Sequence, residues 1–179
     1  MAREIPLSRG FVTIVDDADY EWLSQWKWSY KNVGGGGAVA ESYAGRTDNH
    51  RRKTLYMHRE ILQASKGDYC DHINGNGLDN RRSNLRLCTN GQNLFNKDKP
   101  RIRKATSKYK GVVLRRTSRG RVSWAARIKA NKKGYWIGTF ATELDAARAY
   151  DAAARELHGA FAYLNFPADA TNATAQQGE

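Results

Sequence analysis

Hydrophobic and polar residues alternate regularly between residues 121 and 129. The even positions of this segment are apolar: Val122, Trp124, Ala126 and Ile128. Arg121, Arg127 and Lys129 mark the odd positions. A period of two predicts a strand with one packed face and one cationic face. We expect residues 108–116 and 133–140 to be its neighbours in a three-stranded antiparallel sheet.

A helical pattern follows this predicted sheet. Thr142 is a suitable N-cap and Gly159 a suitable C-terminal stop for an alanine-rich helix over residues 143–157. Its expected inner stripe consists of Leu144, Ala147, Tyr150, Ala154 and Leu157. The sequence therefore predicts a three-stranded antiparallel sheet packed on one helix within residues 107–167.

Residues 1–54 predict a β-rich N-terminal extension. The β-branched run 11–15 favours a strand, and residues 38–46 the returning strand of a hairpin that follows the glycine run 34–37. Five aromatic residues lie close together in this segment: Tyr20, Trp22, Trp26, Trp28 and Tyr30. Such a density is more typical of a core than of a binding surface.

The segment after this extension predicts two short helices and two strands. In order, we expect a helix over 54–64, strands over 69–73 and 84–88, and a helix over 90–97. The run Asn74-Gly75-Asn76-Gly77 favours a turn between the strands, since Gly and Asn accept positive φ at little cost. Thr89 is a suitable N-cap for the second helix.

Charge is concentrated in one part of the chain. The formal net charge is +12, and residues 97–140 hold 15 of the 30 Lys and Arg residues with 1 acid. Such a block, interleaved with aromatic residues, is typical of a surface that binds a polyanion. An RNA-binding protein fits the charge too, but the chain has no matching motif.

Two cysteines, Cys70 and Cys88, are too few for a disulfide framework. We favour a buried reduced pair; a zinc site that adds a histidine is the alternative, without support from a Cys-x-x-Cys pair. There is no signal peptide and no apolar run long enough to span a bilayer. These features predict a soluble intracellular protein without membrane contact.

A carboxylate beside a histidine suits the hydrolysis of phosphodiesters. A histidine whose pKa is near neutrality can act as a general base toward water. Asp71-His72 is such a pair, and it is followed by an unusual run of asparagines: Asn74, Asn76, Asn80, Asn84, Asn90, Asn93 and Asn96. Their side chains are suited to local bracing, to ligation, or to both.

Asp71-His72, Asn84-Leu85 and the pair Asn93-x-x-Asn96 after Thr89 resemble the HNH (ββα-metal) nucleases, a group that includes many phage and intron homing endonucleases. The resemblance implies that His72 is the general base and that Asn84 holds its ring. It implies that Asp71 and Asn93 bind one Mg²⁺ or Mn²⁺. Many members have a histidine at the position of Asn93, which leaves Asn96 as an alternative ligand.

The motifs YKGV, WAARI, WIGTF, AARAYD and LNFP resemble the plant ethylene-response-factor (Apetala-type) DNA-binding domain. That family lays its sheet in the major groove of double-stranded DNA. Four positions match its contacting residues: Lys110, Arg115, Lys129 and Trp136. Arg121 and Arg127 are further cationic candidates. Val113, Thr117 and Gly134 depart from the pattern, so the plant target sequence does not transfer.

Together these patterns predict an α+β chain with two functional modules. The expected organisation is a β-rich extension (1–54), an HNH module (55–98), a basic linker (99–106), an ethylene-response-factor-like domain (107–167) and a disordered tail (168–179). The function that the resemblance implies is a site-specific, homing-type DNA endonuclease, expected to be a monomer in the cytoplasm of a prokaryotic or phage-infected cell. The alternative is a non-catalytic, sequence-specific DNA-binding regulator with a degenerate nuclease fold.

Overall fold

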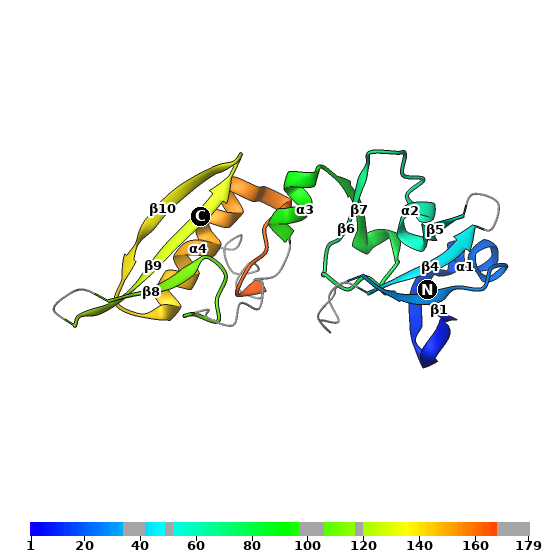
Figure 1. Cartoon of the computed structure of the whole chain (residues 1–179), viewed down its shortest axis with the longest axis horizontal. Helices are drawn as coiled ribbons and strands as arrows, with labels where there is room; N and C mark the ends of the chain where they lie inside the picture. Colours follow the sequence, from blue (N-terminus) through cyan, green and yellow to red (C-terminus); the bar gives the residue numbers. More distant parts are fainter. Residues whose placement is uncertain (34–41, 49–51, 97–105, 117–119, 168–179) are drawn as a thin grey trace, which may run out of the picture. The chain divides into compact units, whose positions relative to one another are not determined.

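The computed structural model describes residues 1–33, 42–48, 52–96, 106–116 and 120–167. The chain forms two compact units, Met1–Asn93 and Leu94–Glu179. Figure 1 gives the order of their helices and strands. The predicted linker lies almost wholly outside the described residues, as does the predicted tail.

The first unit begins with a hairpin of β1 (Ala2–Pro6) and β2 (Val12–Asp16), linked by a 3-10 turn over Ser8–Gly10. A helix, α1 (Asp17–Ser24), follows directly. The β-rich extension predicted for residues 1–54 thus also contains a helix that the sequence patterns did not indicate. Asp17 and Asp19 lie in the first turn of α1, where carboxylates stabilise the positive end of the helix dipole.

Three antiparallel strands form the next sheet, in the order β3 (Ser29–Asn32), β4 (Ser42–Asp48) and β5 (Lys53–Tyr56). The expected returning strand over 38–46 corresponds to β4, whose described part starts at Ser42. The glycine run 34–37 lies outside the described residues.

The helix expected over 54–64 is shorter than its apolar pattern suggested. Thr54, Leu55 and Tyr56 pair with β4, so only Met57–Ile61 forms the helix α2. Backbone hydrogen bonds to β4 outweigh the helical periodicity of this segment. Met57 and Ile61, one helical turn apart, are both buried.

The strand–loop–strand–helix order predicted around the Asn-rich run is confirmed. β6 (Tyr69–His72) pairs antiparallel with β7 (Leu85–Cys88), and α3 (Asn90–Asn96) follows. A 3-10 turn, Arg82–Asn84, precedes β7.

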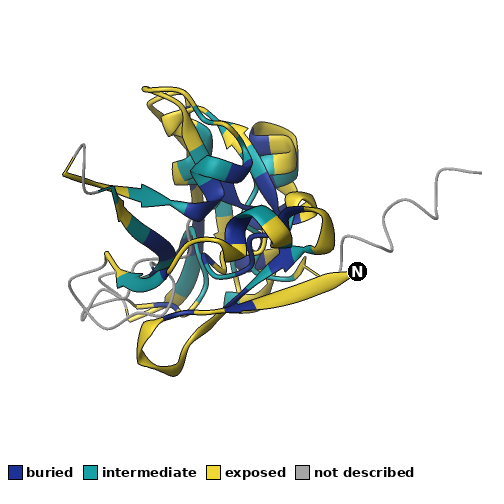
Figure 2. Cartoon of the chain, turned by 90° about the vertical axis from the view of Figure 1, so that its right-hand side faces the viewer, coloured by how far each residue is buried: buried dark blue, intermediate teal, exposed yellow. Residues whose placement is uncertain are grey.

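One hydrophobic core holds the first unit together. Ile5, Leu7 and Val15 of the N-terminal hairpin pack with Met57, Ile61 and Leu85. In Figure 2, β1 beside the N-terminus is mostly exposed and has one buried residue, which is Ile5. The N-terminal extension and the β6–β7 segment therefore share a core.

The second unit is a three-stranded antiparallel sheet packed on one helix, as predicted. Its strands are β8 (Val112–Arg116), β9 (Val122–Ala130) and β10 (Lys133–Phe140), with β9 in the centre. The helix α4 (Glu143–His158) lies along this sheet (Figure 1) and is followed by a 3-10 turn, Gly159–Phe161. Thr142 caps α4, because its Oγ1 accepts a hydrogen bond from Asp145 N at 3.1 Å.

Small residues let α4 lie close to β9. Ala146, Ala147 and Ala154 are fully buried against the sheet. Leu144 and Leu157, expected on the inner stripe, are exposed instead. The buried stripe of α4 also includes Asp151 and His158, so it is rotated about the helix axis away from the two leucines.

Gly111, in the YKGV motif, is required by this close packing. Its φ is +77°, and a Cβ there would overlap the ring of Tyr150 on α4.

No helix in the described ranges is both long and apolar enough to cross a membrane.

Candidate functional site

Asp71 and His72 end β6, and both are 6% exposed. Asp71 lies opposite Arg86 on β7, whereas His72 lies opposite Leu85. Adjacent strand residues direct their side chains to opposite faces of the sheet. The two side chains therefore have different partners.

The carboxylate of Asp71 is held by an arginine that the sequence did not point to. Arg86 Nε and Nη2 donate to Asp71 Oδ2 at 2.8 and 2.6 Å. The Arg86 side chain is 16% exposed, so this ion pair is largely shielded from water. The antiparallel register of the two predicted strands is the signal that could have identified it.

The ring of His72 is bound by Asn80. Its Nε2 lies 3.3 Å from Asn80 Oδ1. Burial is the main cause that lowers the pKa of His72 from 6.5; the hydrogen bond to Asn80 and the charges of Asp71 and Asp79 act in the opposite direction. A histidine with a lowered pKa is neutral at pH 7 and has a lone pair that can accept a proton.

Asn84, expected to hold the His72 ring, braces the loop between the strands instead. Its Nδ2 donates to Asp79 O at 2.7 Å, and its Oδ1 accepts from Asn74 N at 2.9 Å. Both bonds join backbone groups of residues 74–84 to the start of β7. Asn80, which lies eight residues after His72, takes the role expected of Asn84.

Other asparagines of the run close tight turns in the same loop. Asn74 Oδ1 accepts from Asn76 N at 2.8 Å, and Asn76 Oδ1 accepts from Leu78 N at 3.0 Å. Asn74 Nδ2 donates to Asp79 Oδ2 at 2.9 Å. The bracing role expected for this run is therefore observed, since side-chain oxygens here replace missing backbone partners.

The N-terminal hairpin and α1 support this loop from outside it. Ile14 N donates to Leu78 O at 2.9 Å, and Asn80 N donates to Ile14 O at 2.7 Å. Arg82 binds Asp19 of α1 through two hydrogen bonds of 2.7 Å, and this contact lowers the pKa of the Asp19 carboxyl. The extension thus positions the segment that holds His72.

A second histidine, His58 of α2, contacts His72. The two ring centroids are 5.1 Å apart in an edge-to-face arrangement, and the ring of Tyr43 lies 5.2 Å from His58. Burial, chiefly, lowers the pKa of His58 to about 3, so this ring is neutral.

Asn93 lies on α3, four residues after a Thr89 cap that is confirmed. Thr89 Oγ1 accepts from Gln92 N at 3.2 Å, and Gln92 Oε1 accepts from Thr89 N at 2.8 Å. This reciprocal pair is a capping box. Asn93 is partly exposed, as is Asn96 one turn further along.

The donor types available suit a hard cation. In the described part of the chain, no three His, Cys, Asp or Glu side chains gather at a metal-binding distance. Mg²⁺ is commonly held by one or two carboxylates, with water and phosphate oxygens completing its shell. One carboxylate at Asp71 and one amide on α3 fit that pattern.

The two cysteines do not form a zinc site in the described structure. Cys88 lies opposite Tyr69 and Cys70 opposite Leu87, which puts the two thiols on opposite faces of the β6–β7 pair. Both are free, and burial raises the pKa of each. Both cysteines are only partly buried, so the buried pair favoured from the sequence is not observed.

The side chain of Arg59 is bound within the first unit. Its guanidinium donates to the carbonyls of Ser65 at 2.8 Å and Asp68 at 2.7 Å. It therefore closes the turn between α2 and β6.

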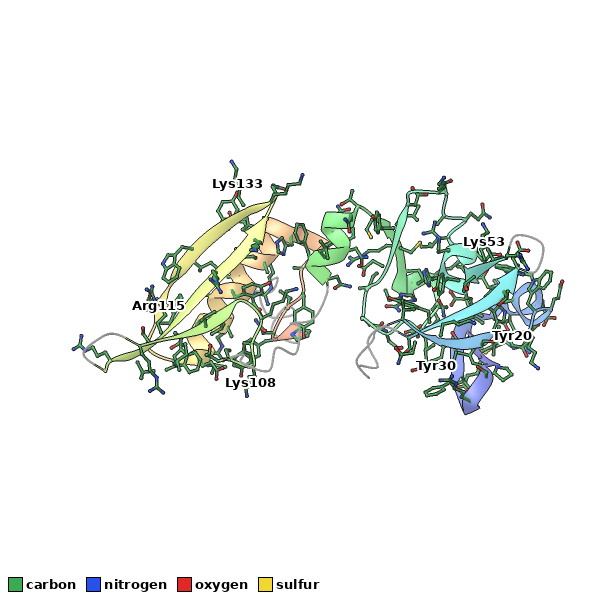
Figure 3. All side chains as sticks on the ribbon, in the orientation of Figure 1. Tyr20, Tyr30, Lys53, Lys108, Arg115 and Lys133 are labelled. Atoms are coloured by element: carbon green, nitrogen blue, oxygen red, sulfur yellow. The ribbon has the colours of Figure 1, made fainter. Side chains whose placement is uncertain are left out.

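One face of the second unit's sheet carries exposed cationic and aromatic side chains. Arg127 and Lys129 lie on β9, and Trp136 lies opposite Arg127 on β10 with 55% of its surface exposed. The guanidinium of Arg115 stacks 5.3 Å from the Trp136 ring centre. Figure 3 labels Arg115, which projects from β8. We call Arg115, Arg127, Lys129 and Trp136 the cationic face.

Lys110 and Arg121 are placed differently from these four residues. Lys110 Nζ donates to Phe95 O at 2.7 Å and lies 4.8 Å from the Tyr163 ring centre, both within the second unit. Its ammonium thus contacts the end of α3, where the helix carbonyls attract a cation. Arg121 is exposed just before β9.

Two family models match the chain. The model described as HNH endonuclease matches residues 56–94, and the model described as AP2 domain matches residues 107–160. Both kinds of domain bind DNA. Asp71, His72, Asn84 and Asn93 fall within the first match, whereas residues 1–55 precede it.

Similar proteins match either nearly the whole chain or its second unit. An HNH endonuclease of Acanthamoeba polyphaga mimivirus is 32% identical over 163 residues, which is 89% of this chain and 78% of the relative. The dehydration-responsive element-binding protein 2D of Arabidopsis thaliana is 46% identical over 65 residues, which is 35% of this chain and 30% of the relative.

An ethylene-responsive transcription factor of Arabidopsis thaliana is 41% identical over 70 residues, 38% of this chain and 36% of the relative. The chain thus spans about a third of the length of these two plant relatives. No solved structure matches it. Both resemblances noted in the sequence are confirmed: the chain belongs to the HNH endonuclease family and carries an AP2 domain in its C-terminal part.

Proposed function

We propose that the chain is a site-specific, homing-type DNA endonuclease that hydrolyses phosphodiester bonds with His72 as the general base. The carrying observation is a neutral, buried His72 ring, bound to Asn80 at 3.3 Å, at the strand position next to Asp71. A neutral imidazole at this position accepts a proton from the attacking water and stores it as an imidazolium. The nearby carboxylates of Asp71 and Asp79 stabilise that charge.

Asp71 and Asn93 are the residues proposed to hold one Mg²⁺ or Mn²⁺, with Asn96 as the alternative to Asn93. When bound, such an ion neutralises charge on the scissile phosphate and on the departing 3′ oxygen. Arg86 fixes the Asp71 carboxylate in position through two hydrogen bonds. Asn84 and Asn74 hold the intervening loop in the form that presents Asn80.

The cationic face of the second unit is proposed to bind double-stranded DNA as a monomer. Arg127 and Lys129 can neutralise phosphates, and Arg115 with Trp136 can contact bases and sugars in the groove. Phosphate contacts supply most of the salt-dependent affinity, so this unit holds the substrate while the first unit cuts.

A supercoiled-plasmid nicking assay with Mg²⁺ or Mn²⁺ tests this proposal. The wild-type protein is expected to nick or cut, and His72→Ala to lose about 10²- to 10⁴-fold in rate while still binding DNA. Asp71→Asn is expected to raise the metal concentration required. If the wild-type protein cuts no DNA of a broad library with either ion, the proposed endonuclease function is refuted.

One observation favours the second candidate function, a non-catalytic regulator with a nuclease-shaped fold. The Asp71 carboxylate is already engaged by Arg86, and His72 is 6% exposed. Tight, salt-sensitive and sequence-selective binding without cleavage would establish that function instead.

A further inference from the structure

Thr13 of β2 lies in the segment before the matched nuclease region, yet it belongs to the hydrogen-bond network of His72. Its side chain is completely buried, as is that of Asn80. Thr13 Oγ1 donates its proton to Leu78 O at 2.7 Å. A hydroxyl has a single proton, and that of Thr13 is used in the bond to Leu78 O. In its hydrogen bond with Asn80, the Thr13 hydroxyl oxygen must therefore be the acceptor.

This restriction orients the amide of Asn80. Asn80 Nδ2 donates to Thr13 Oγ1 at 2.7 Å, which directs Oδ1 toward His72. The assignment of nitrogen and oxygen in a side-chain amide follows from such a network. Backbone hydrogen bonds from Asn80 N to Ile14 O and from Ile14 N to Leu78 O hold the three groups in place.

The oriented amide in turn selects one tautomer of His72. An amide oxygen only accepts hydrogen bonds, so the His72 Nε2 at 3.3 Å from it carries the proton. The lone pair of the neutral ring is then on Nδ1. The order of donors runs from His72 Nε2 to Asn80 Oδ1, from Asn80 Nδ2 to Thr13 Oγ1, and from Thr13 Oγ1 to Leu78 O.

We propose that Thr13, acting through Asn80, is a positioning residue that sets the tautomer of His72 and so decides which ring nitrogen serves as the base. The proposal rests on the proposed role of His72 in DNA cleavage. In this proposal the N-terminal hairpin contributes to catalysis, through Thr13, as well as to the stability of the fold. A hydrogen-bond partner of this kind acts on the ring without touching the substrate.

The test is a long-range ¹H–¹⁵N correlation spectrum of the full-length, metal-free protein with ¹⁵N-labelled histidine, which reports the tautomer of each ring. Thr13→Val removes the hydroxyl and keeps the shape, and Thr13→Ser is the matched control that restores the hydroxyl. We expect His72 to be protonated at Nε2 in the wild-type and Thr13→Ser proteins. In Thr13→Val, where the Asn80 amide is no longer oriented, we expect a mixture of tautomers.

The cleavage rate at saturating DNA provides the second readout. Thr13→Val is expected to lower this rate by about tenfold and to leave KM unchanged. The loss is only a part of the rate enhancement that a general base supplies, because some of the His72 rings keep the correct tautomer. Thr13→Ser is expected to restore it.

Three outcomes would overturn the proposal. They are a wild-type His72 protonated at Nδ1, a Thr13→Val protein with an unchanged tautomer, and a Thr13→Ser protein that fails to restore the rate. The first needs no variant, so a Thr13→Val protein that fails to fold does not remove the test. The two proposals can fail separately. If the tautomers are as expected but the wild-type protein cuts no DNA, the proposed endonuclease function is refuted, whereas the positioning of the His72 ring by Thr13 is supported.

Discussion

Arg86 and Asp71 face each other across β6 and β7, with Arg86 Nη2 2.6 Å from Asp71 Oδ2 in a largely buried ion pair. A carboxylate in this position requires a partner, because an unpaired buried charge is strongly unfavourable. The stability of Asp71, the proposed cation ligand, in this buried position therefore depends on Arg86.

Arg86→Met is expected to lower the free energy of unfolding by about 3 kcal/mol, since it removes both hydrogen bonds and the compensating charge that Arg86 gives to the buried Asp71 carboxylate. Urea unfolding followed by tryptophan fluorescence measures the loss. The double variant Asp71→Asn/Arg86→Met is the control, and it should recover most of the stability. Equal losses in the single and double variants would contradict a role for the ion pair.

The pH dependence of cleavage follows from the lowered pKa of His72. A base acts in its neutral form, so the rate is expected to be constant at neutral pH and to fall only below pH 6.5, the ordinary value for histidine. Initial rates between pH 5 and 8 at fixed metal concentration measure this limb. A rate that still rises with pH above 7.5 would argue against His72 as the base.

His58 is expected to make the first unit sensitive to acid. Its pKa is about 3 in the folded protein against 6.5 for the ordinary side chain, so the unfolded chain binds the proton more readily. This contribution to stability is fully present above pH 6.5 and is lost as the pH falls toward 3. His58→Phe should reduce the loss in urea midpoint between pH 7.5 and pH 5, and an unchanged loss would exclude His58 as its cause.

Asn84→Ala is expected to destabilise the loop of residues 74–84. It removes the bond to Asp79 O, a buried contact whose loss costs about 1–3 kcal/mol, and the bond to the backbone N–H of the exposed Asn74. Faster amide hydrogen exchange at Asn74 would report the loosened loop. Because Asn80 holds the ring, the His72 tautomer should not change; a changed tautomer would restore to Asn84 the role expected from the sequence.

Arg127→Ala is expected to weaken DNA binding and to reduce the slope of log affinity against log salt by about one, the effect of one lost phosphate contact. Fluorescence anisotropy with a labelled duplex at several salt concentrations measures it. Lys110→Met is the matched control, because its ammonium is engaged by Phe95 O and should leave the slope unchanged. If Lys110→Met reduces the slope more than Arg127→Ala does, the DNA does not bind to the cationic face.

Much of the local structure could be predicted from the sequence. The alternation of residues 121–129, the Thr142 and Thr89 caps and the Asn-Gly turn each depend on neighbours a few positions away. Such patterns act through backbone preference and periodicity, so they survive without knowledge of the rest of the chain. For the same reason the helix predicted over 54–64 was too long: its pattern is local, but the pairing of Leu55 with Arg46 is not.

The sequence by itself determined which residue types meet at the site: an acid, a histidine and a supply of amides. Only the tertiary structure decided their partners, because these come from other strands. Thr13 reaches Asn80 across 67 positions, Arg86 reaches Asp71 across 15, and the ring of His72 turns to Asn80 rather than Asn84. Hydrogen bonds depend on distances of a few tenths of an ångström, and packing alone sets these between segments remote in sequence.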